Sequence, residues 1–417
     1  MSTCRLAGVR AVGFALFAAA LGGAQAQTTV EQLGEALYFD QNLSLNRNQS
    51  CASCHDPAFG FVDPDNVVNG LPVSKGSVEG LTGGLNAPSA AYAAFSPFFH
   101  WNEVDGLFVG GQFWNGRANT LAEQAAGPFL NPVEMAMPDK WSVVDRLRDS
   151  DLPDYQTMFM EVYGLDLKAV AKYRGDYMTP VAVEDFPPGV LEVYDRMAKA
   201  IGEFEKTPLF TRFNAKFDYF LAGRAQLTKE EETGLKLFDG KGKCNLCHLS
   251  APALAPDGVS SLPPMFTDFT YDNLGVPQNL NIPGQPIDPG LGGRADIAAI
   301  DPDGLQLGKH KVMTLRNIDL TPPYGHNGVF RTLEEIVHFY NTRDVLAPCD
   351  PTLGNNDPGF GVTCWPAPEV PANVNDAELG NLGLTPAQEA AIVAFLKTLS
   401  DGWSTAELPR PPMPPMP

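Results

Sequence analysis

Residues 51–55 read Cys51-Ala52-Ser53-Cys54-His55, and residues 244–248 repeat the pattern as Cys244-Asn245-Leu246-Cys247-His248. Cys-x-x-Cys-His is the spacing for covalent attachment of a c-type haem, in which both thiols add to the porphyrin vinyl groups. The imidazole beside the second thioether then lies where it can bind the iron from the proximal side. Two copies followed by the same residue predict two covalently bound c-type haems.

Other chemistry also uses Cys-x-x-Cys pairs. Two pairs can form a zinc site, and one pair can act as a redox dithiol. Zinc ribbons usually bring their pairs within about 15–20 residues of each other, whereas these pairs lie almost half the chain apart. Neither alternative explains the histidine after both pairs, so the sequence favours two haems.

The first 26 residues have the pattern of a secretory signal peptide. Arg5 and Arg10 precede an apolar run at 11–23 that is too short to span a bilayer, and Ala24-Gln25-Ala26 is a small-x-small cleavage site. No later segment reads as a membrane span. Because bacteria attach c-type haem outside the cytoplasmic membrane, we expect cleavage near Ala26 and a periplasmic protein.

Two cysteines remain once the haem motifs and the leader are accounted for. Cys4 would leave with the signal peptide, so Cys349 and Cys364 are left of the seven. They flank a loop rich in Gly, Asn, Pro and Asp. In an oxidising compartment such a pair favours a disulfide over two free thiols.

The chain is acidic, with 49 Asp and Glu against 29 Lys and Arg and a formal net charge of −20. This charge argues against nucleic acid and anionic membranes as partners. It favours a basic protein partner, although solubility alone also explains it. With 417 residues and 44% hydrophobic content the chain can bury two cores.

An internal repeat precedes the haem motifs. A segment with glycine and aromatic residues leads into each motif, at Val30–Asp40 and Thr228–Asp239. Thr228 and Glu231 have the spacing of a capping box, which gives the second segment a definite helical start. Both segments are therefore predicted to be helices that lead into a haem motif.

An amphipathic helix closes each half. Apolar residues recur at helical spacing over residues 190–204, and Thr385 with Gln388 forms a capping box ahead of a second apolar stripe. Helix, haem motif, loops and closing helix occur twice. We therefore expect a mostly α fold of two cytochrome-c-like domains, at 27–225 and 226–417, without a sustained strand.

The segment after the first motif holds more than an electron carrier needs. Three strings stand out there: Gly111-Gln112-Phe113-Trp114-Asn115-Gly116-Arg117-Ala118, Leu121-Ala122-Glu123-Gln124-Ala125-Ala126-Gly127-Pro128 and Asn131-Pro132-Val133-Glu134-Met135. With the haem motifs they resemble the bacterial dihaem cytochrome c peroxidase and MauG family, in particular its MauG- or MbnH-like members. The resemblance covers nearly the whole chain after the leader. It implies a peroxidase that cleaves hydrogen peroxide at the first haem, and two haem domains packed around a calcium site.

The family pattern assigns the peroxide pocket. Glu134 matches the distal glutamate of the first haem, and Gln124 matches its glutamine neighbour. A carboxylate in a partly dry pocket can move a proton between the peroxide oxygens, while an amide holds the peroxide by a hydrogen bond. Taken alone, Glu134 would read as a solvated surface acid.

The resemblance assigns three residues around the haems. Trp114 matches the tryptophan between the two haems, where an indole can relay electrons; a packed core indole is the alternative. Arg117 and Arg316 are expected to bind haem propionates through charge-assisted hydrogen bonds. Each of these roles rests on the family pattern.

The calcium ligands follow from the same resemblance. The side chain of Asn86 and the backbone carbonyls of Thr321 and Pro323 match the family's interdomain Ca²⁺ site. Ca²⁺ prefers hard oxygen ligands of this kind. Asn86 also fits an ordinary turn.

The first departure from the activated peroxidases is a missing histidine. Those enzymes carry one shortly after the first haem motif, and it caps the resting iron. Between His55 and Asn86 this sequence has none, so the first haem is expected to be five-coordinate. His100 is the other candidate, and it reads more simply as a loop or core residue.

The second departure concerns the far side of the second haem. Counted from His326, Tyr340 falls where most members have a methionine ligand and where MauG-type members have tyrosine. Methionine raises a haem potential, whereas phenolate stabilises oxidised iron. Met313, which replaces a usual proline, is the alternative ligand. The spacing favours Tyr340.

These patterns predict a peroxidase of the MauG type that oxidises a distant donor, such as a residue of a partner protein. One alternative is a cytochrome c peroxidase that removes peroxide with electrons from a small cytochrome. A non-enzymatic dihaem electron carrier is the other, and it would leave the peroxide pocket unused. MauG-type members place a surface tryptophan where this chain has Gly242. The other candidate exits are Trp101, Trp141, Trp365 and Trp403.

Overall fold

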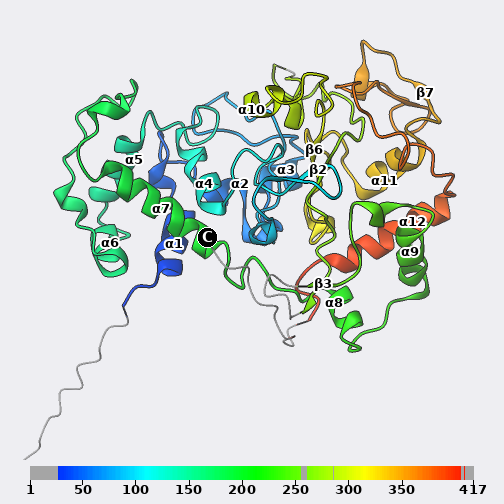
Figure 1. The fold of residues 1–417 in the computed structure, drawn as a ribbon, viewed down its shortest axis with the longest axis horizontal. Helices are drawn as coiled ribbons and strands as arrows, with labels where there is room; N and C mark the ends of the chain where they lie inside the picture. Colours follow the sequence, from blue (N-terminus) through cyan, green and yellow to red (C-terminus); the bar gives the residue numbers. More distant parts are fainter. Residues whose placement is uncertain (1–26, 255–260, 285, 405–407, 409–417) are drawn as a thin grey trace, which may run out of the picture.

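The computed structural model describes residues 27–254, 261–284, 286–404 and 408. The predicted signal peptide lies outside the described residues. Two groups of helices lie at opposite ends, and loops with short strands lie between them (Figure 1). The helices of the described residues are α1 (Val30–Phe39), α2 (Cys51–Cys54), α3 (Pro64–Asn69), α4 (Leu121–Ala126), α5 (Lys140–Arg148), α6 (Tyr155–Tyr163), α7 (Val190–Phe204), α8 (Lys216–Leu221), α9 (Lys229–Asp239), α10 (Ala295–Ala298), α11 (Leu333–Thr342) and α12 (Pro386–Leu396).

The strands are two or three residues long and pair locally, which agrees with the predicted mostly α fold. Three of the sheets are antiparallel hairpins or bridges between loops, and one is parallel. The pairs are β1 (His100–Asn102) with β2 (Leu107–Val109), β3 (Ala253–Leu254) with β4 (Ser261–Leu262), β5 (Tyr271–Asp272) with β6 (His310–Lys311), and β7 (Ala347–Pro348) with β8 (Cys364–Trp365).

The predicted helix starts are confirmed. Thr228 and Glu231 bond reciprocally at the start of α9, and Thr385 and Gln388 do the same at α12. Pro386 occupies the first turn of α12, where its missing N–H costs nothing. These caps satisfy backbone N–H groups that the first helical turn leaves unpaired.

The two halves that repeat in the sequence also pack their helices in the same way. Helix α1 packs on α7 in the first half, and α9 packs on α12 in the second. At each crossing a glycine faces the backbone of the partner helix: Gly34 meets the carbonyl of Ala200, and Gly234 meets that of Ala391. A Cβ at either glycine would collide with that carbonyl, so each crossing requires a residue without a side chain.

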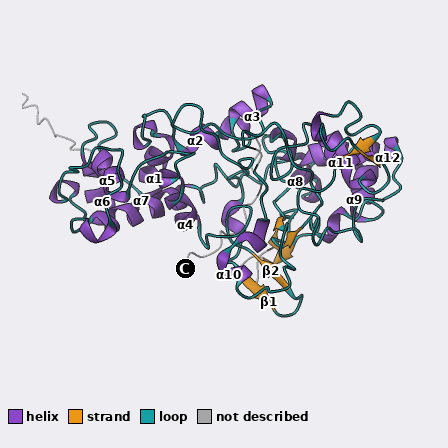
Figure 2. Ribbon diagram, turned by 90° about the horizontal axis from the view of Figure 1, so that it is seen from above, coloured by secondary structure: helices purple, strands orange, loops and turns teal. Residues whose placement is uncertain are grey.

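Two hydrophobic cores accompany the two helix pairs. The first core is formed by buried residues between Leu33 and Phe213, together with Leu262 and Met265. The second core is formed by buried residues from Phe217 onward. Figure 2 shows the two helix groups on either side of the central loops. The core membership changes close to residue 215. The domain limits 27–225 and 226–417 stay a prediction.

A disulfide joins Cys349 and Cys364, as predicted. It closes the loop that follows α11, and the indole N–H of Trp365 donates to Oγ1 of Thr342 at 3.0 Å. The bridge therefore fastens this loop to the end of α11. Among the described residues, no helix combines the length and the apolar character that spanning a bilayer would require.

Candidate functional site

The two predicted haem motifs present the same local geometry. Cys51, Cys54, Cys244 and Cys247 are free thiols. Nδ1 of His55 lies 3.1 Å from the carbonyl oxygen of Phe61, and Nδ1 of His248 lies 2.9 Å from that of Phe266. A carbonyl partner places the proton on Nδ1 and leaves the Nε2 lone pair for a metal.

Burial sets the protonation of these groups. It lowers the pKa of His55, and it lowers the pKa of His248 to about 4, so both imidazoles are neutral at pH 7. Burial also raises the pKa of Cys54 and of Cys244 to about 12. Neutral imidazoles and intact thiol pairs are what covalent haem attachment requires.

The repeat extends to the backbone around each histidine. The carbonyl of Phe61 and the backbone of Pro88 oppose the lowering of the pKa of His55 by burial. The backbone of Met313 likewise opposes the lowering of the pKa of His248 by burial. Met313 is thus the second-half counterpart of Pro88, and it lies on the histidine side of the second motif.

Trp114 joins the two histidine surroundings. Its indole N–H donates to the carbonyl of Asn86 at 2.9 Å, and Asn86 is two residues from Pro88. Its own carbonyl accepts the N–H of Lys311 at 2.8 Å, and Lys311 is two residues from Met313. Trp114 therefore lies between the segments that reach the two histidines.

Glu134 lies beside the first motif. Its backbone carbonyl accepts the N–H of Ser77 at 2.6 Å, in a turn that folds back after α4. Burial raises the pKa of Glu134, while the charge of Arg117 and a hydrogen bond from Asn131 oppose that rise. The pKa of Cys54 is raised mainly by burial, and the charge of Glu134 adds to this rise. The carboxyl is thus close enough to the first motif to influence Cys54; its role at the haem stays a prediction.

Gln124 and Arg117 flank this turn. Gln124 is half-buried on α4, the helix immediately before it. The guanidinium of Arg117 lies over the ring of Phe113, 3.4 Å from its centroid, and donates to Oδ1 of Asn115 at 3.2 Å. The structure thus brings Arg117 near Glu134. A role for either residue at the haem stays a prediction.

Tyr340 belongs to the second motif. It lies on α11, and burial, followed by the charges of Cys244 and Cys247, raises the pKa of its phenol. Its hydroxyl is therefore near the thiols of the second motif, whereas Met313 is on the side of the histidine. The choice of Tyr340 over Met313 as a ligand on the far side stays a prediction.

Arg316 is engaged inside the protein. Its Nη2 and Nη1 donate to the carboxylate of Asp218 at 2.9 and 3.1 Å, and its Nε donates to the carbonyl of Pro264 at 2.8 Å. Both side chains of the ion pair are almost fully buried. Two of its five N–H donors are left for another acceptor, so contact with a propionate stays a prediction.

The predicted calcium ligands lie on two segments that meet. The backbone N–H of Asn86 donates to the carbonyl of His326 at 2.8 Å, and its side-chain amide donates to the carbonyl of Pro72 at 3.1 Å. Thr321 and Pro323 precede His326 in the same loop. Because the amide nitrogen is used, the amide oxygen of Asn86 is the atom suited to a cation.

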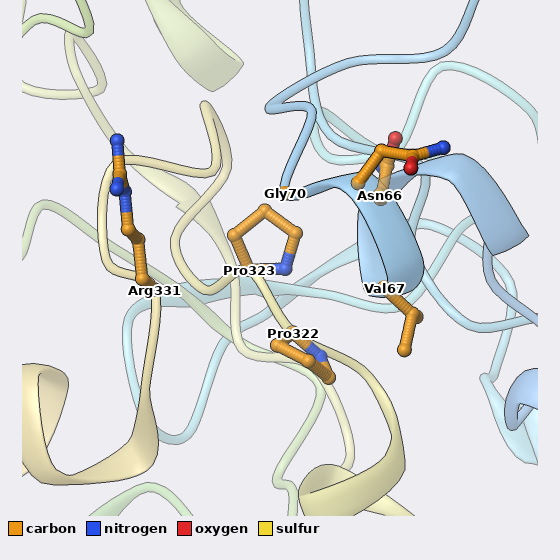
Figure 3. Close-up of a pocket in the computed structure, with 7 residues that line it drawn as sticks. Asn66, Val67, Gly70, Pro322, Pro323 and Arg331 are labelled. Carbon is orange, nitrogen blue, oxygen red and sulfur yellow. The ribbon is translucent and has the colours of Figure 1, made fainter.

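A small cavity lies beside this loop (Figure 3). Pro322 and Pro323 form one wall of the cavity, which has a volume of about 190 Å³, and Asn66 and Gly70 at the α3 end form another. Ca²⁺ takes six to eight oxygen ligands, so three protein oxygens leave room for water. Of the three predicted ligands the cavity borders Pro323 but neither Asn86 nor Thr321, so the calcium site stays a prediction.

The sequence matches the family model described as di-haem cytochrome c peroxidase over residues 28–226. It is 38% identical to methylamine utilization protein MauG of Paracoccus denitrificans, over 90% of this chain and 89% of the relative. The chain belongs to the dihaem cytochrome c peroxidase family. This dihaem peroxidase is also 32% identical to cytochrome c551 peroxidase of Nitrosomonas europaea, over 73% of the chain and 71% of that relative. The crystal structure of the diheme peroxidase BthA from Burkholderia thailandensis matches with a TM-score of 0.71 and 28% identity, covering 92% and 90% of the two chains.

Membership makes the protein a peroxidase with two haems, and the residues present fit that cofactor. Each motif offers two free thiols and a histidine whose Nδ1 faces a backbone carbonyl, an arrangement that suits a ligand nitrogen at Nε2. The binding of a haem by these four thiols and two histidines stays a prediction that their chemistry fits.

Two features of the site were not predicted. Lys311 is buried, its Nζ donates to Ser96 and to the carbonyl of Gly111, and burial lowers its pKa to about 7. The rings of His310 and His326 stack at 3.7 Å beside Trp114. No local pattern in the sequence marks Lys311 or His310, and His326 serves there only as the residue from which Tyr340 is counted. Their partners come from distant segments that no local pattern links to them.

Proposed function

We propose that this dihaem peroxidase is a MauG-type enzyme of the periplasm that uses hydrogen peroxide to oxidise a residue of a partner protein. The position of Tyr340 carries this proposal. A phenolate ligand stabilises oxidised iron, so it favours holding oxidising equivalents over relaying electrons from a donor. The absence of histidine between His55 and Asn86 also supports it, because peroxide would need no prior activation step.

The peroxide chemistry is assigned to Glu134 and Gln124. When bound, the haem of the first motif supplies the iron on which the O–O bond is cleaved. Burial raises the pKa of Glu134 above that of an exposed glutamate, which favours a carboxyl that accepts and returns a proton. Gln124 would hold the peroxide in place by a hydrogen bond.

Trp114 is the proposed link between the halves. Its indole donates to Asn86 and its backbone carbonyl accepts from Lys311, so Trp114 lies between the segments next to His55 and His248. An indole is readily oxidised and can pass an electron between the two haems. Arg117 and Arg316 are proposed to support the haem propionates.

Export and calcium belong to the same proposal. The disulfide between Cys349 and Cys364 supports an oxidising compartment such as the periplasm. Asn86, Thr321 and Pro323 would bind Ca²⁺ where the loops of the two halves meet. That ion would fix Asn86, and through it the indole of Trp114.

A second candidate is a peroxidase that removes peroxide with electrons from a small cytochrome c. The 32% identity to a protein named cytochrome c551 peroxidase favours it. Steady-state turnover with reduced cytochrome c separates the two: rapid turnover supports this candidate, and slow turnover supports the MauG type.

The direct test adds one equivalent of peroxide to the ferric holoenzyme and follows both irons by EPR and optical spectroscopy. The proposal expects long-lived loss of both ferric signals, because the second haem shares the oxidation. Loss of the first signal alone would contradict it. A resting enzyme that is low-spin at both irons and binds no cyanide would contradict the five-coordinate first haem.

A further inference from the structure

We propose that Trp101 is the residue through which the substrate protein is oxidised, and that the β1–β2 hairpin is the surface on which this protein docks. The inference rests on the proposed function for the existence of a protein substrate. It adds the path by which electrons leave the substrate protein and the chemistry of the surface that this protein presents. Four rings in sequence and an exposed apolar patch carry it.

The rings form a continuous path from the surface inward. Trp101 is 41% exposed, and its ring lies 4.9 Å from that of Phe108. Phe108 stacks on Phe99 at 5.1 Å with an angle of 7° between the planes, and Phe99 meets Tyr271 edge-on at 5.8 Å. Tyr271 is buried. An oxidisable residue thus stands at each end of the path.

The inner end of the path, Tyr271, lies near the Trp114 loop and the second haem motif. On β5, Tyr271 pairs with Lys311, whose N–H donates to the carbonyl of Trp114. The carboxylate of the next residue, Asp272, lies within 4.8 Å of the thiol of Cys247. Gly116 leaves no room for a Cβ because the hydroxyl of Tyr271 occupies that space. Tyr271 therefore lies between the Trp114 loop and the second haem motif.

The other tryptophans fit an exit less well. Trp141 and Trp365 are buried, with 9% and 2% exposure. Trp403 is 49% exposed, and the ring neighbour that it has among the described residues is Tyr219, at 5.2 Å. Trp101 differs in having a ring path that leads to the Trp114 loop.

The surface around Trp101 is built for a protein. Three further apolar side chains of the hairpin segment are exposed: Phe98 by 45%, Val104 by 92% and Leu107 by 37%. The hairpin stands out from the body beside α10 (Figure 2). An exposed cluster of large apolar side chains that stands clear of the fold marks an interaction site.

Charge indicates the partner. Glu103 and Asp105 are exposed at the turn of the hairpin. Asp296 on α10 is also exposed, but its charge is paired with that of Arg294. This acidic rim opposes docking of a second copy of a chain whose net charge is −20. The partner that complements this surface is a protein whose oxidisable tryptophan or tyrosine lies in an apolar patch ringed by Lys and Arg.

The electrons balance in this scheme. Reduction of one hydrogen peroxide to two waters takes two electrons and two protons. The substrate side chains supply both: each electron passes inward through Trp101, which is re-reduced by the substrate. The oxidised substrate side chain releases one proton for each electron that it loses.

The test uses the holoenzyme without any partner. Repeated addition of peroxide should then oxidise the exit residue itself, and peptide mapping by mass spectrometry should find added oxygen on Trp101. W101F should lengthen the lifetime of the peroxide-oxidised state by about tenfold or more, whereas W403F should leave it unchanged. Oxidation at Trp403 with Trp101 intact, or an unchanged lifetime in W101F, would overturn the inference.

A second arm tests docking with a probe of the expected charge. A Lys-rich peptide with one central tryptophan should be oxidised by the wild type, about tenfold more slowly by W101F, and with a raised KM by E103K/D105K. Equal rates for the Lys-rich peptide and a Glu-rich counterpart would overturn the docking surface. Wild-type enzyme that fails to lose both ferric signals would instead refute the proposed function, so the two failures are distinguishable.

Discussion

The indole N–H of Trp114 donates to the backbone carbonyl of Asn86 at 2.9 Å. This bond ties the residue proposed to link the haems to the residue proposed to bind calcium. The backbone carbonyl of Trp114 accepts the N–H of Lys311, so the main chain of Trp114 is fixed by the second half of the chain while its indole is fixed by the first. A residue whose side chain and backbone are both fixed has a defined distance to each neighbour, which electron transfer requires.

Replacing Trp114 with Phe tests this link. The variant keeps an aromatic ring but loses the oxidisable indole and its hydrogen bond. We expect peroxide to react at the first haem while the second haem stays ferric, as seen by EPR. W141F is the matched control, since Trp141 is also a buried indole that donates to a carbonyl, that of Ala171. Loss of both ferric signals in W114F would contradict the relay.

Glu134→Gln tests the acid–base role. The amide cannot accept a proton, so the single-turnover rate of peroxide cleavage should fall by about 10²–10⁴-fold. The neighbouring exposed E123Q should react at the wild-type rate. Stopped-flow spectroscopy measures both, and an unchanged rate in E134Q would remove this residue from the mechanism.

The pH profile supplies an independent check on Glu134. Burial raises the pKa of this carboxyl, so its carboxylate form is lost at a higher pH than that of an exposed glutamate. The wild-type rate should therefore fall on acidification through this raised pKa. E134Q should lack that acid limb; a variant that retains it would assign the limb to another group.

Tyr340→Met tests the ligand of the second haem. A thioether raises the potential of a haem relative to a phenolate, so potentiometric titration should show a higher potential for the second haem. The variant should also fail to hold the oxidised state. M313L is the control and should keep the wild-type potential. A shift in M313L with none in Y340M would reverse the assignment.

The glycines at the helix crossings predict a stability effect. G34A and G234A each place a Cβ against a partner carbonyl, and overpacking of this kind costs about 1–3 kcal/mol. Guanidinium unfolding followed by circular dichroism measures the loss. T233A on the exposed face of α9 should change stability by less than about 0.5 kcal/mol. Alanine variants as stable as the wild type would contradict the close crossing.

Local signals in the sequence predicted the parts of the fold that depend on neighbouring residues. Capping boxes located the starts of α9 and α12, and the haem motifs located the thiols and histidines. The pairing of Cys349 with Cys364 followed from counting. In each case the residues that interact are close in sequence, or belong to a motif of fixed spacing.

The rest depends on contacts between distant segments. Lys311 donates to Gly111, 200 residues away, and nothing in its surrounding string indicates burial. The backbone of Met313 acts on His248 as the backbone of Pro88 acts on His55, and no local sequence pattern predicts either contact. The ring path from Trp101 to Tyr271 likewise joins segments that the sequence keeps apart. Such arrangements arise from tertiary packing, which periodicity does not encode.

The disulfide has a consequence for how this enzyme matures. Cys349 and Cys364 close the loop whose Trp365 bonds to Thr342, two residues beyond Tyr340 on the same helix. A chain made in a reducing cytosol would therefore lack the clamp behind its proposed tyrosinate, even if both porphyrins were supplied. Disulfide formation and haem ligation would thus both be needed for maturation. The thiol oxidases of the host cell would then determine whether the iron site forms correctly.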